Sequence, residues 1–208
     1  MRRYTSSFIV VGVTLSALLA LAAHALFGGR GVMCPAGGFA LTPGGRELAR
    51  LKNRVGAPEA GEFDEKVSLE ALLQPGDDRA RWSESRAARV EGYVVEVAEG
   101  GVEAANCYAF DGRDVHIHVA ARADAPRAEW VVVEVTPRAK RWAAERGWDW
   151  RAAALKKELT GRRCRFEGRL LFDREHAGES EHTAPGERGN WRATAWELHP
   201  VTRIEVLN

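Results

Sequence analysis

The sequence carries almost no net charge, which excludes a protein whose whole surface is adapted to nucleic acid. Its 208 residues include 30 basic and 29 acidic residues, a formal net charge of +1 at pH 7. A protein that attracts nucleic acid through its overall electrostatic field needs a clear excess of basic over acidic residues. A local basic face stays open as an alternative, because four arginines cluster: Arg162, Arg163, Arg165 and Arg169.

Cysteine is also scarce, with only Cys34, Cys107 and Cys164 in the chain. In an exported protein, an odd number leaves at least one thiol outside any disulfide. Two interpretations remain open for Cys107 and Cys164: a disulfide, if the fold brings them together, or two buried free thiols. Cys34 follows Met33, whose side chain is too large for the position before a lipoprotein cysteine, so lipid attachment is not expected.

A run without any Asp, Glu, Lys or Arg covers residues 8–27, and Arg2 and Arg3 precede it. Twenty helical residues span about 30 Å, the thickness of the hydrocarbon core of a membrane. Residues 1–27 are therefore either a retained transmembrane anchor with its basic end in the cytoplasm or a signal peptide cleaved near residues 23–25. The first interpretation places the remaining chain outside the cytoplasm at the bacterial cell membrane, and the second makes it periplasmic or secreted.

Glycine and proline are concentrated just after this run. Residues 28–45 hold seven glycines and two prolines, a composition typical of a tether. Short helices are predicted at Glu47–Val55 and at Ser68–Leu73, where the first residue of the second segment can cap its helix. We therefore expect a tether with short helices over residues 28–88 and a folded domain over residues 89–208.

Alternation of apolar and polar residues predicts the strands of this domain. In Val131–Arg138, valines at alternate positions face one side, and Pro137 ends the strand because proline has no N–H to donate. Residues 139–160 have a helical composition with a break near Gly147. The other strands are expected at Arg89–Val97, Asp114–Val119, Arg163–Asp173 and Trp191–Leu207, the last one bent at His199-Pro200 and preceded by a mobile polar loop at Glu175–Asn190.

The order strand, strand, strand, helix, strand, strand is similar to that of OB-fold domains, which are five-stranded barrels with a helix between the third and fourth strands. This resemblance covers about Arg89 to Leu207 and implies a mainly β, OB-like barrel. The run Arg-Ala-Thr-Ala-Trp-Glu-Leu-His-Pro-Val at residues 192–201, after residues 171–176, also resembles a group of uncharacterised exported bacterial proteins with OB-like domains. A resemblance of fold fixes no activity.

Two segments are similar to parts of the staphylococcal-type thermonucleases, which also have an OB-fold. These segments are Asp-Gly-Arg-Asp at residues 111–114 and Glu-Val-Thr-Pro-Arg at residues 134–138. Where that family has its calcium-binding Asp and its catalytic Glu, this chain has Val135 and Arg138. Valine and arginine supply neither a ligand for a hard cation nor a base, so thermonuclease activity is not expected.

A candidate metal site comes from the strand at residues 114–119. His116 and His118 are two residues apart, so both side chains point to the same face, and Glu134 lies on a neighbouring strand. Two imidazoles and a carboxylate suit a divalent metal such as zinc, with an open position for a water molecule. The alternative is that these side chains are only polar surface.

A candidate binding site lies near the C-terminus, where the ends of two neighbouring strands bring polar side chains into one region. A ligand pocket there is one interpretation, and an Arg192–Asp173 salt bridge that fixes the hairpin is the other. Aromatic rings for stacking are a further signal, although tryptophans more often serve the core. The stacking candidates are Tyr93, Tyr108, Trp130, Trp191 and Trp196, with Arg165, Arg169 and Arg192. The candidate binding residues are Asp173, His176, Arg192, Trp196, Glu197 and His199.

Together these patterns predict a membrane-tethered, envelope-facing OB-like domain that binds a ligand or a protein partner. A location outside the cytoplasm argues against genomic DNA as the ligand. The sequence contains no complete catalytic motif. One alternative is a metal-assisted hydrolase of a phosphodiester or glycan, built either on the candidate metal site or on Asp173, His176 and His199. Another is a structural accessory subunit of a membrane complex.

Overall fold

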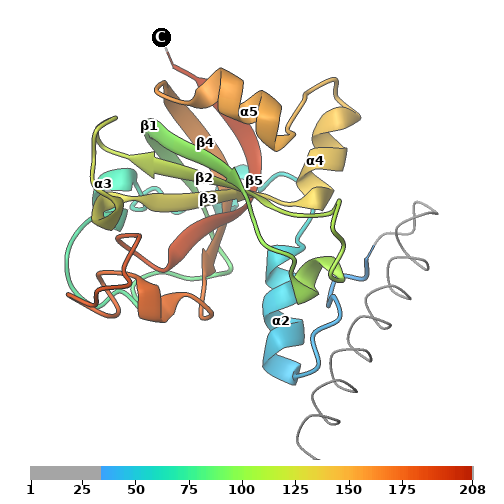
Figure 1. Cartoon of the computed structure of the whole chain (residues 1–208), viewed down its shortest axis with the longest axis horizontal. Helices are drawn as coiled ribbons and strands as arrows, with labels where there is room; N and C mark the ends of the chain where they lie inside the picture. Colours follow the sequence, from blue (N-terminus) through green and yellow to red (C-terminus); the bar gives the residue numbers. More distant parts are fainter. Residues whose placement is uncertain (1–33, 208) are drawn as a thin grey trace, which may run out of the picture. The chain divides into compact units, whose positions relative to one another are not determined.

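The computed structural model describes residues 34–207 (Figure 1). The described chain divides into two compact units, one made of residues 34–50 and 102–113, the other of residues 51–101 and 114–207. The predicted transmembrane or signal segment lies outside the described residues. Between residues 34 and 207, no helix has both the length and the apolar character needed to cross a membrane.

The larger unit is a closed barrel with the strand order β1-β2-β3-β5-β4. Neighbouring strands are antiparallel except for β3 and β5, which pair in parallel. The prediction of a mainly β, five-stranded barrel is therefore confirmed. The strands are β1 (Ala87–Glu99), β2 (Val115–Ala120), β3 (Val131–Val135), β4 (Arg163–Phe172) and β5 (Trp196–Val206).

Alternate side chains of each strand fill the barrel. Val131, Val133 and Val135 of β3 are fully buried in one apolar cluster with residues from the other four strands, as their spacing predicts. Gly92 permits the close approach of β1 to β2, because a Cβ atom there would lie 2.6 Å from Val119 Cγ1. Burial of this apolar surface is the main source of the barrel's stability.

The helices follow local sequence signals. α3 (Leu69–Leu72) is capped by the predicted Ser68, whose hydroxyl accepts a hydrogen bond from the N–H of Ala71. At the end of β3, Thr136 caps the next helix in the same way, and Pro137 occupies its first turn, where a missing N–H costs nothing. The predicted helical region between β3 and β4 forms two helices around the break at Gly147, α4 (Pro137–Ala144) and α5 (Ala152–Leu159).

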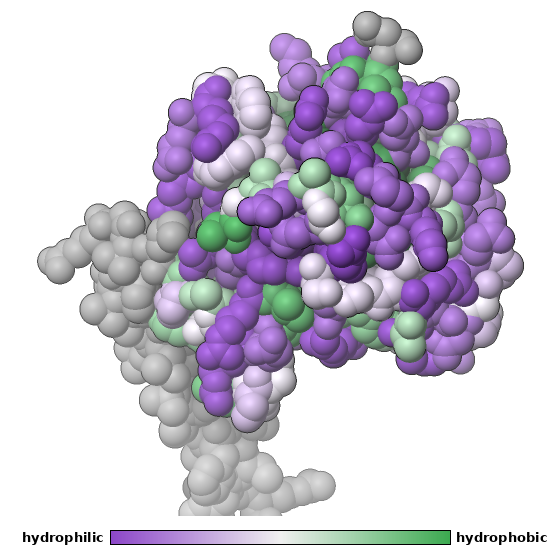
Figure 2. All heavy atoms as spheres, turned by 180° about the vertical axis from the view of Figure 1, so that it is seen from behind, coloured by the Kyte–Doolittle hydropathy of each residue, from purple (hydrophilic) through white to green (hydrophobic). Residues whose placement is uncertain are grey.

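The local basic face that the sequence left open does not form on β4, because its arginines pair with glutamates. Arg165 lies 2.6 Å from Glu91 and 3.3 Å from Glu205. Arg169 lies 2.5 Å from Glu62. Figure 2 shows a surface on which hydrophilic side chains dominate and apolar ones are scattered. The arginine cluster therefore contributes a paired, mixed-charge surface.

The smaller unit includes part of the segment expected to be a tether. Within residues 34–42, the N–H of Phe39 donates to the carbonyl of Ala104, near the short helix η3 (Ala104–Asn106). α2 (Pro43–Lys52) follows and ends in the larger unit. A disulfide joins Cys34 to Cys107. From residue 34 onward, this Gly/Pro-rich segment is thus fixed by hydrogen bonds and a covalent link.

Neither of the two interpretations left open for Cys107 and Cys164 holds, because the two residues do not pair with each other and only Cys164 is a free thiol. Cys107 follows η3 in the smaller unit and pairs with Cys34, whereas Cys164 is a free thiol on β4 with its side chain in the barrel core. Burial raises the pKa of the Cys164 thiol to about 11, so this side chain stays protonated and unreactive near neutral pH.

Thiol counting checks this pairing. In denaturant without reductant, we expect one reactive thiol per chain, and three after reduction. Cys164→Ser separates the two pairings, because it removes the one free thiol and the unreduced count should fall to zero. If Cys107 were instead paired with Cys164, the same substitution would raise the unreduced count to two.

Candidate functional site

The strand register gathers polar side chains on the outer face of the barrel. β3 and β5 pair with Val133 opposite Leu198, both in the core. Because side chains alternate along a strand, Glu134 of β3 and Glu197 and His199 of β5 point to the other face. β2 adds His116, which lies directly opposite Glu134 in the β2–β3 pair.

The segment between β4 and β5, residues 173–195, supplies the remaining polar groups. It was predicted to be a mobile loop followed by a strand from Trp191, but β5 begins only at Trp196. Two residues that precede β5, Arg192 and Ala193, instead form backbone hydrogen bonds with the preceding loop. The N–H of Glu181 donates to the carbonyl of Arg192, and the N–H of His182 donates to the carbonyl of Ala193. These bonds hold Arg192 inward, where it is fully buried.

Seven side chains form one continuous chain of contacts, called the buried network below. Its first half runs from His176 to Glu197. His176 Nδ1 lies 2.6 Å from Asp173 Oδ2, and Arg192 Nη2 lies 3.3 Å from the same oxygen. Arg192 Nη1 then donates to Glu197 Oε1 at 2.5 Å. The salt bridge predicted between Arg192 and Asp173 is therefore one link of a longer chain.

The second half of the buried network runs from Glu197 to His116. His199 Nδ1 lies 3.3 Å from Glu197 Oε2 and 3.1 Å from Glu134 Oε2. Glu134 Oε1 lies 3.3 Å from His116 Nε2. Only the two ends reach the surface, since the His176 side chain is 38% exposed and that of His116 is 21% exposed. The members are His176, Asp173, Arg192, Glu197, His199, Glu134 and His116.

Burial and charge give the acids of this network different proton affinities. Burial and, less strongly, the nearby charge of Asp173 raise the pKa of Glu197 to about 7 against the opposing charge of Arg192. Burial also acts on Asp173, but the hydrogen bond with His176 and the charge of Arg192 hold its pKa well below the ordinary range. The hydrogen bond with Asp173 raises the pKa of His176. The ionised pair of His176 and Asp173 at one end of the buried network is thus linked, through Arg192, to the carboxyl group of Glu197, which exchanges its proton near neutral pH.

The predicted metal group of His116, His118 and Glu134 is only partly brought together. His116 contacts Glu134, whereas His118 is opposite Val132 and lies 3.4 Å from Glu96. Burial, together with the smaller effect of the neighbouring His116, lowers the pKa of His118 to about 4. His118 is therefore neutral and lies outside the buried network.

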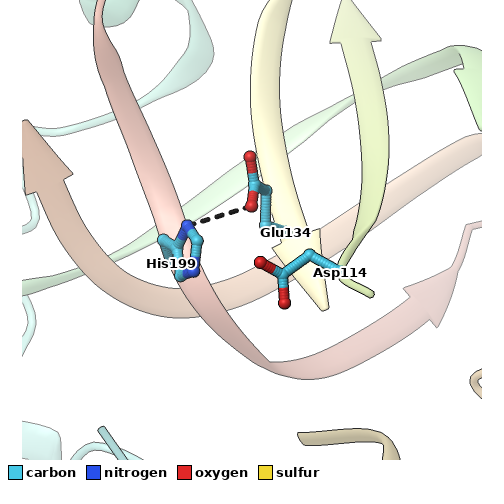
Figure 3. Close-up of side chains that lie close together, drawn as sticks. All are labelled: Asp114, Glu134 and His199. Atoms are coloured by element: carbon cyan, nitrogen blue, oxygen red, sulfur yellow. Dashed lines mark ion pairs between the residues drawn. The ribbon is translucent and has the colours of Figure 1, made fainter. Parts of the chain in front are cut away.

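A different group has metal-ligand spacing. Asp114, Glu134 and His199 are all buried, and one ligand atom of each lies within 4.8 Å of those of the other two (Figure 3). Asp114 immediately precedes β2, and its carboxylate points toward His199. Asp114 stands at the start of a predicted strand, but no local pattern marks it as a ligand, because its proximity to His199 of β5 depends on long-range strand pairing.

Trp196 does not share this face with the other candidate binding residues. Its indole Nε1 donates to the carbonyl of Asp78 at 2.7 Å, and its ring packs against Trp82 and Phe172 in the core. The Asp78 carboxylate is fully buried and accepts hydrogen bonds from His182 Nδ1, at 3.0 Å, and from the hydroxyl of Thr194. No local motif marks Asp78, which lies in a charged stretch of the sequence.

A ring cluster lies beside the exposed end of the buried network. His118 is 5.1 Å from the Trp130 ring and 5.7 Å from the Trp191 ring, and His176 is 6.1 Å from Trp191. Both indoles are held by hydrogen bonds, from Trp191 Nε1 to Glu179 and from Trp130 Nε1 to the carbonyl of Ala125. The ring cluster is defined as Trp130, His118, Trp191 and His176.

No protein-family model matches this sequence, and comparison with curated proteins finds no similar protein. Function is therefore inferred from the side chains themselves.

Proposed function

We propose that the protein is an envelope-facing OB-like domain that binds a glycan through the ring cluster. The observation that carries this proposal is the grouping of two partly exposed tryptophans around His118, beside the surface end of the buried network. The strand order β1-β2-β3-β5-β4, with helices between β3 and β4, supports the OB-like assignment. The apolar run at residues 8–27 supports an address outside the cytoplasm.

Trp130 and Trp191 have the chemistry that a sugar ring requires. An indole offers a flat apolar face, and its N–H needs a partner when it is partly buried. Here both N–H groups are already bonded within the protein, so the ring orientations are fixed before a ligand arrives. Preorganised side chains lose less entropy on binding. His176, 38% exposed at the edge of the ring cluster, can bond sugar hydroxyls.

A glycan fits this surface better than a nucleic acid. Proteins that bind single strands without sequence preference combine aromatic stacking with a positively charged groove. Of the three arginines expected to line such a groove, Arg165 and Arg169 are paired with glutamates at the surface, and Arg192 is buried and paired with Glu197. The net charge of +1 adds no general attraction for phosphates. Glycans of the bacterial cell envelope are therefore the proposed ligand class.

Titration of the full chain in detergent with soluble peptidoglycan fragments tests this function. We expect saturable binding, and Trp191→Ala should weaken it by about 10-fold or more, because stacking on one aromatic ring contributes about 1–3 kcal/mol. The measurement is isothermal titration calorimetry. Trp148→Ala is the control, since Trp148 is 46% exposed on the connection between α4 and α5. No binding, or an equal loss with Trp148→Ala, would contradict the proposal.

A metal-assisted hydrolase is the second candidate, favoured by the proximity of Asp114, Glu134 and His199. Burial of all three residues argues against it. A catalytic ion needs an open coordination position that a substrate or water can reach. The geometry therefore supports binding at the surface more strongly than hydrolysis in the interior.

A further inference from the structure

We propose that Asp114, Glu134 and His199 form a binding site for one divalent transition-metal ion, such as Zn²⁺ or Mn²⁺ (Figure 3). This site differs from the His116, His118 and Glu134 group that the sequence suggests, and shares only Glu134 with it. It is independent of glycan binding at the ring cluster.

The spacing of the three side chains suits a shared ion. Bonds of about 2.0–2.2 Å from a metal to nitrogen and oxygen place its ligand atoms about 3–4.4 Å apart. One ligand atom from each of Asp114, Glu134 and His199 lies within 4.8 Å of those of the other two. Small side-chain rotations would bring the group to bonding geometry.

The backbone that carries two of these ligands, Glu134 and His199, is well supported. Glu134 is in the centre of the sheet on β3, between β2 and β5. On β5, the carbonyl of His199 accepts a hydrogen bond of 2.9 Å from Arg54, which also donates to the carbonyl of Leu170 on β4. Ligands on paired strands hold their positions better than ligands on loops.

The donor set selects the type of ion. A neutral imidazole with two carboxylates balances the charge of a divalent cation, and so suits an interior where uncompensated charge is costly. Imidazole favours zinc and other first-row transition metals, whereas calcium and magnesium prefer oxygen ligands alone. The expected ion is therefore a transition metal.

Side chains outside the group hold its ligands in orientation. Glu197 Oε2 lies 3.3 Å from His199 Nδ1, and Glu197 is itself held by Arg192. His116 Nε2 lies 3.3 Å from Glu134 Oε1. Metal-binding histidines and carboxylates typically have such outer partners. The buried network thus provides both a ligand pair and its support.

Metal analysis of the tag-free full chain in detergent tests the site. After EDTA treatment and equilibrium dialysis against Zn²⁺ or Mn²⁺ alone, we expect about one ion per chain by mass spectrometry. Asp114→Asn should weaken binding by more than about 100-fold, because even outer-shell changes cost 10–100-fold. Asp111→Asn is the matched control, an exposed carboxylate three positions earlier, and should bind like the unchanged protein.

A second measurement covers the case in which Asp114→Asn fails to fold. In the unchanged protein with ¹⁵N-labelled histidine, Zn²⁺ should shift the His199 imidazole resonances and leave those of His182 in place. The proposal would be overturned by much less than one ion per chain, by an equal loss of metal binding in Asp114→Asn and Asp111→Asn, or by unshifted His199 resonances. Any of these results would indicate that a proton, not a metal ion, lies between the three side chains. Trp191→Ala should retain the ion, so failure of glycan binding and failure of metal binding are distinguishable.

Discussion

Replacing Arg192 with methionine should lower the free energy of unfolding by about 3–5 kcal/mol, the usual effect of removing one partner from a buried ion pair. The guanidinium contacts both Glu197 and Asp173, and all three side chains are buried. Methionine fills much of the volume but leaves two carboxylates without their cation. Such a loss is a large part of the stability of a small domain, and urea unfolding followed by tryptophan fluorescence would measure it.

Arg203→Met is the matched control for this prediction. Arg203 is on the same strand, β5, but its side chain is 59% exposed and pairs with Glu205 at 3.5 Å. An exposed pair of this kind contributes at most about 1 kcal/mol. Adding Glu197→Gln to Arg192→Met should recover part of the loss, because it removes one of the stranded charges. If both arginine variants lost the same stability, Arg192 would have no special role.

The Arg192→Met penalty should also depend on pH. The pKa of Glu197 is raised to about 7 in the folded protein, against 4.5 ordinarily. The folded state therefore binds this proton more tightly than the unfolded state, and stability falls as pH rises from about 4.5 through 7. Without the guanidinium of Arg192, the ionised form of Glu197 is even less stable in the folded protein. The loss of unfolding free energy in Arg192→Met should therefore be larger at pH 8 than at pH 5.

Replacing Asp78 with alanine should cost about 2–4 kcal/mol. The Asp78 carboxylate has no exposed surface and accepts hydrogen bonds from His182 and Thr194, which are also buried. Alanine would leave these two donors without an acceptor, at about 1–3 kcal/mol for each buried unsatisfied group. Urea unfolding again measures the loss, which should appear as a lower midpoint with an unchanged slope.

The neighbouring residue gives a close control. Asp77 has the same side chain, is 58% exposed and pairs with Arg79, so Asp77→Ala should change stability by no more than about 0.5 kcal/mol. A loss with Asp77→Ala that equals the loss with Asp78→Ala would mean that burial of the carboxylate is unimportant here.

Local signals in the sequence predicted the elements of the barrel well. The alternating valines of β3 indicate a strand with a core face, and Thr136-Pro137 marks the start of a helix. These patterns depend on residues a few positions apart, where backbone geometry and capping chemistry leave few alternatives. Ser68 before α3 is a second case of the same kind.

The site depends on contacts that no local pattern encodes. The parallel pairing of β3 with β5 brings His199 beside Glu134, although the helices and β4 separate them in the chain. The period of β2 places His116 and His118 on one face, but the register decides that only His116 meets Glu134. Cys34 lies outside the predicted domain, and no local pattern indicates that it pairs with Cys107.

The Cys34–Cys107 disulfide also determines how the chain carries mechanical load. A pull on the chain from before residue 34, as at a membrane attachment, passes through the sulfur atoms directly to Cys107. Residues 35–106, which include α2, α3 and β1, form a closed covalent loop and lie off the path of the force. Tension would instead enter the barrel through residues 108–114, at the start of β2. Under reducing conditions the same pull would act first on the hydrogen bonds of residues 35–42 and then on α2.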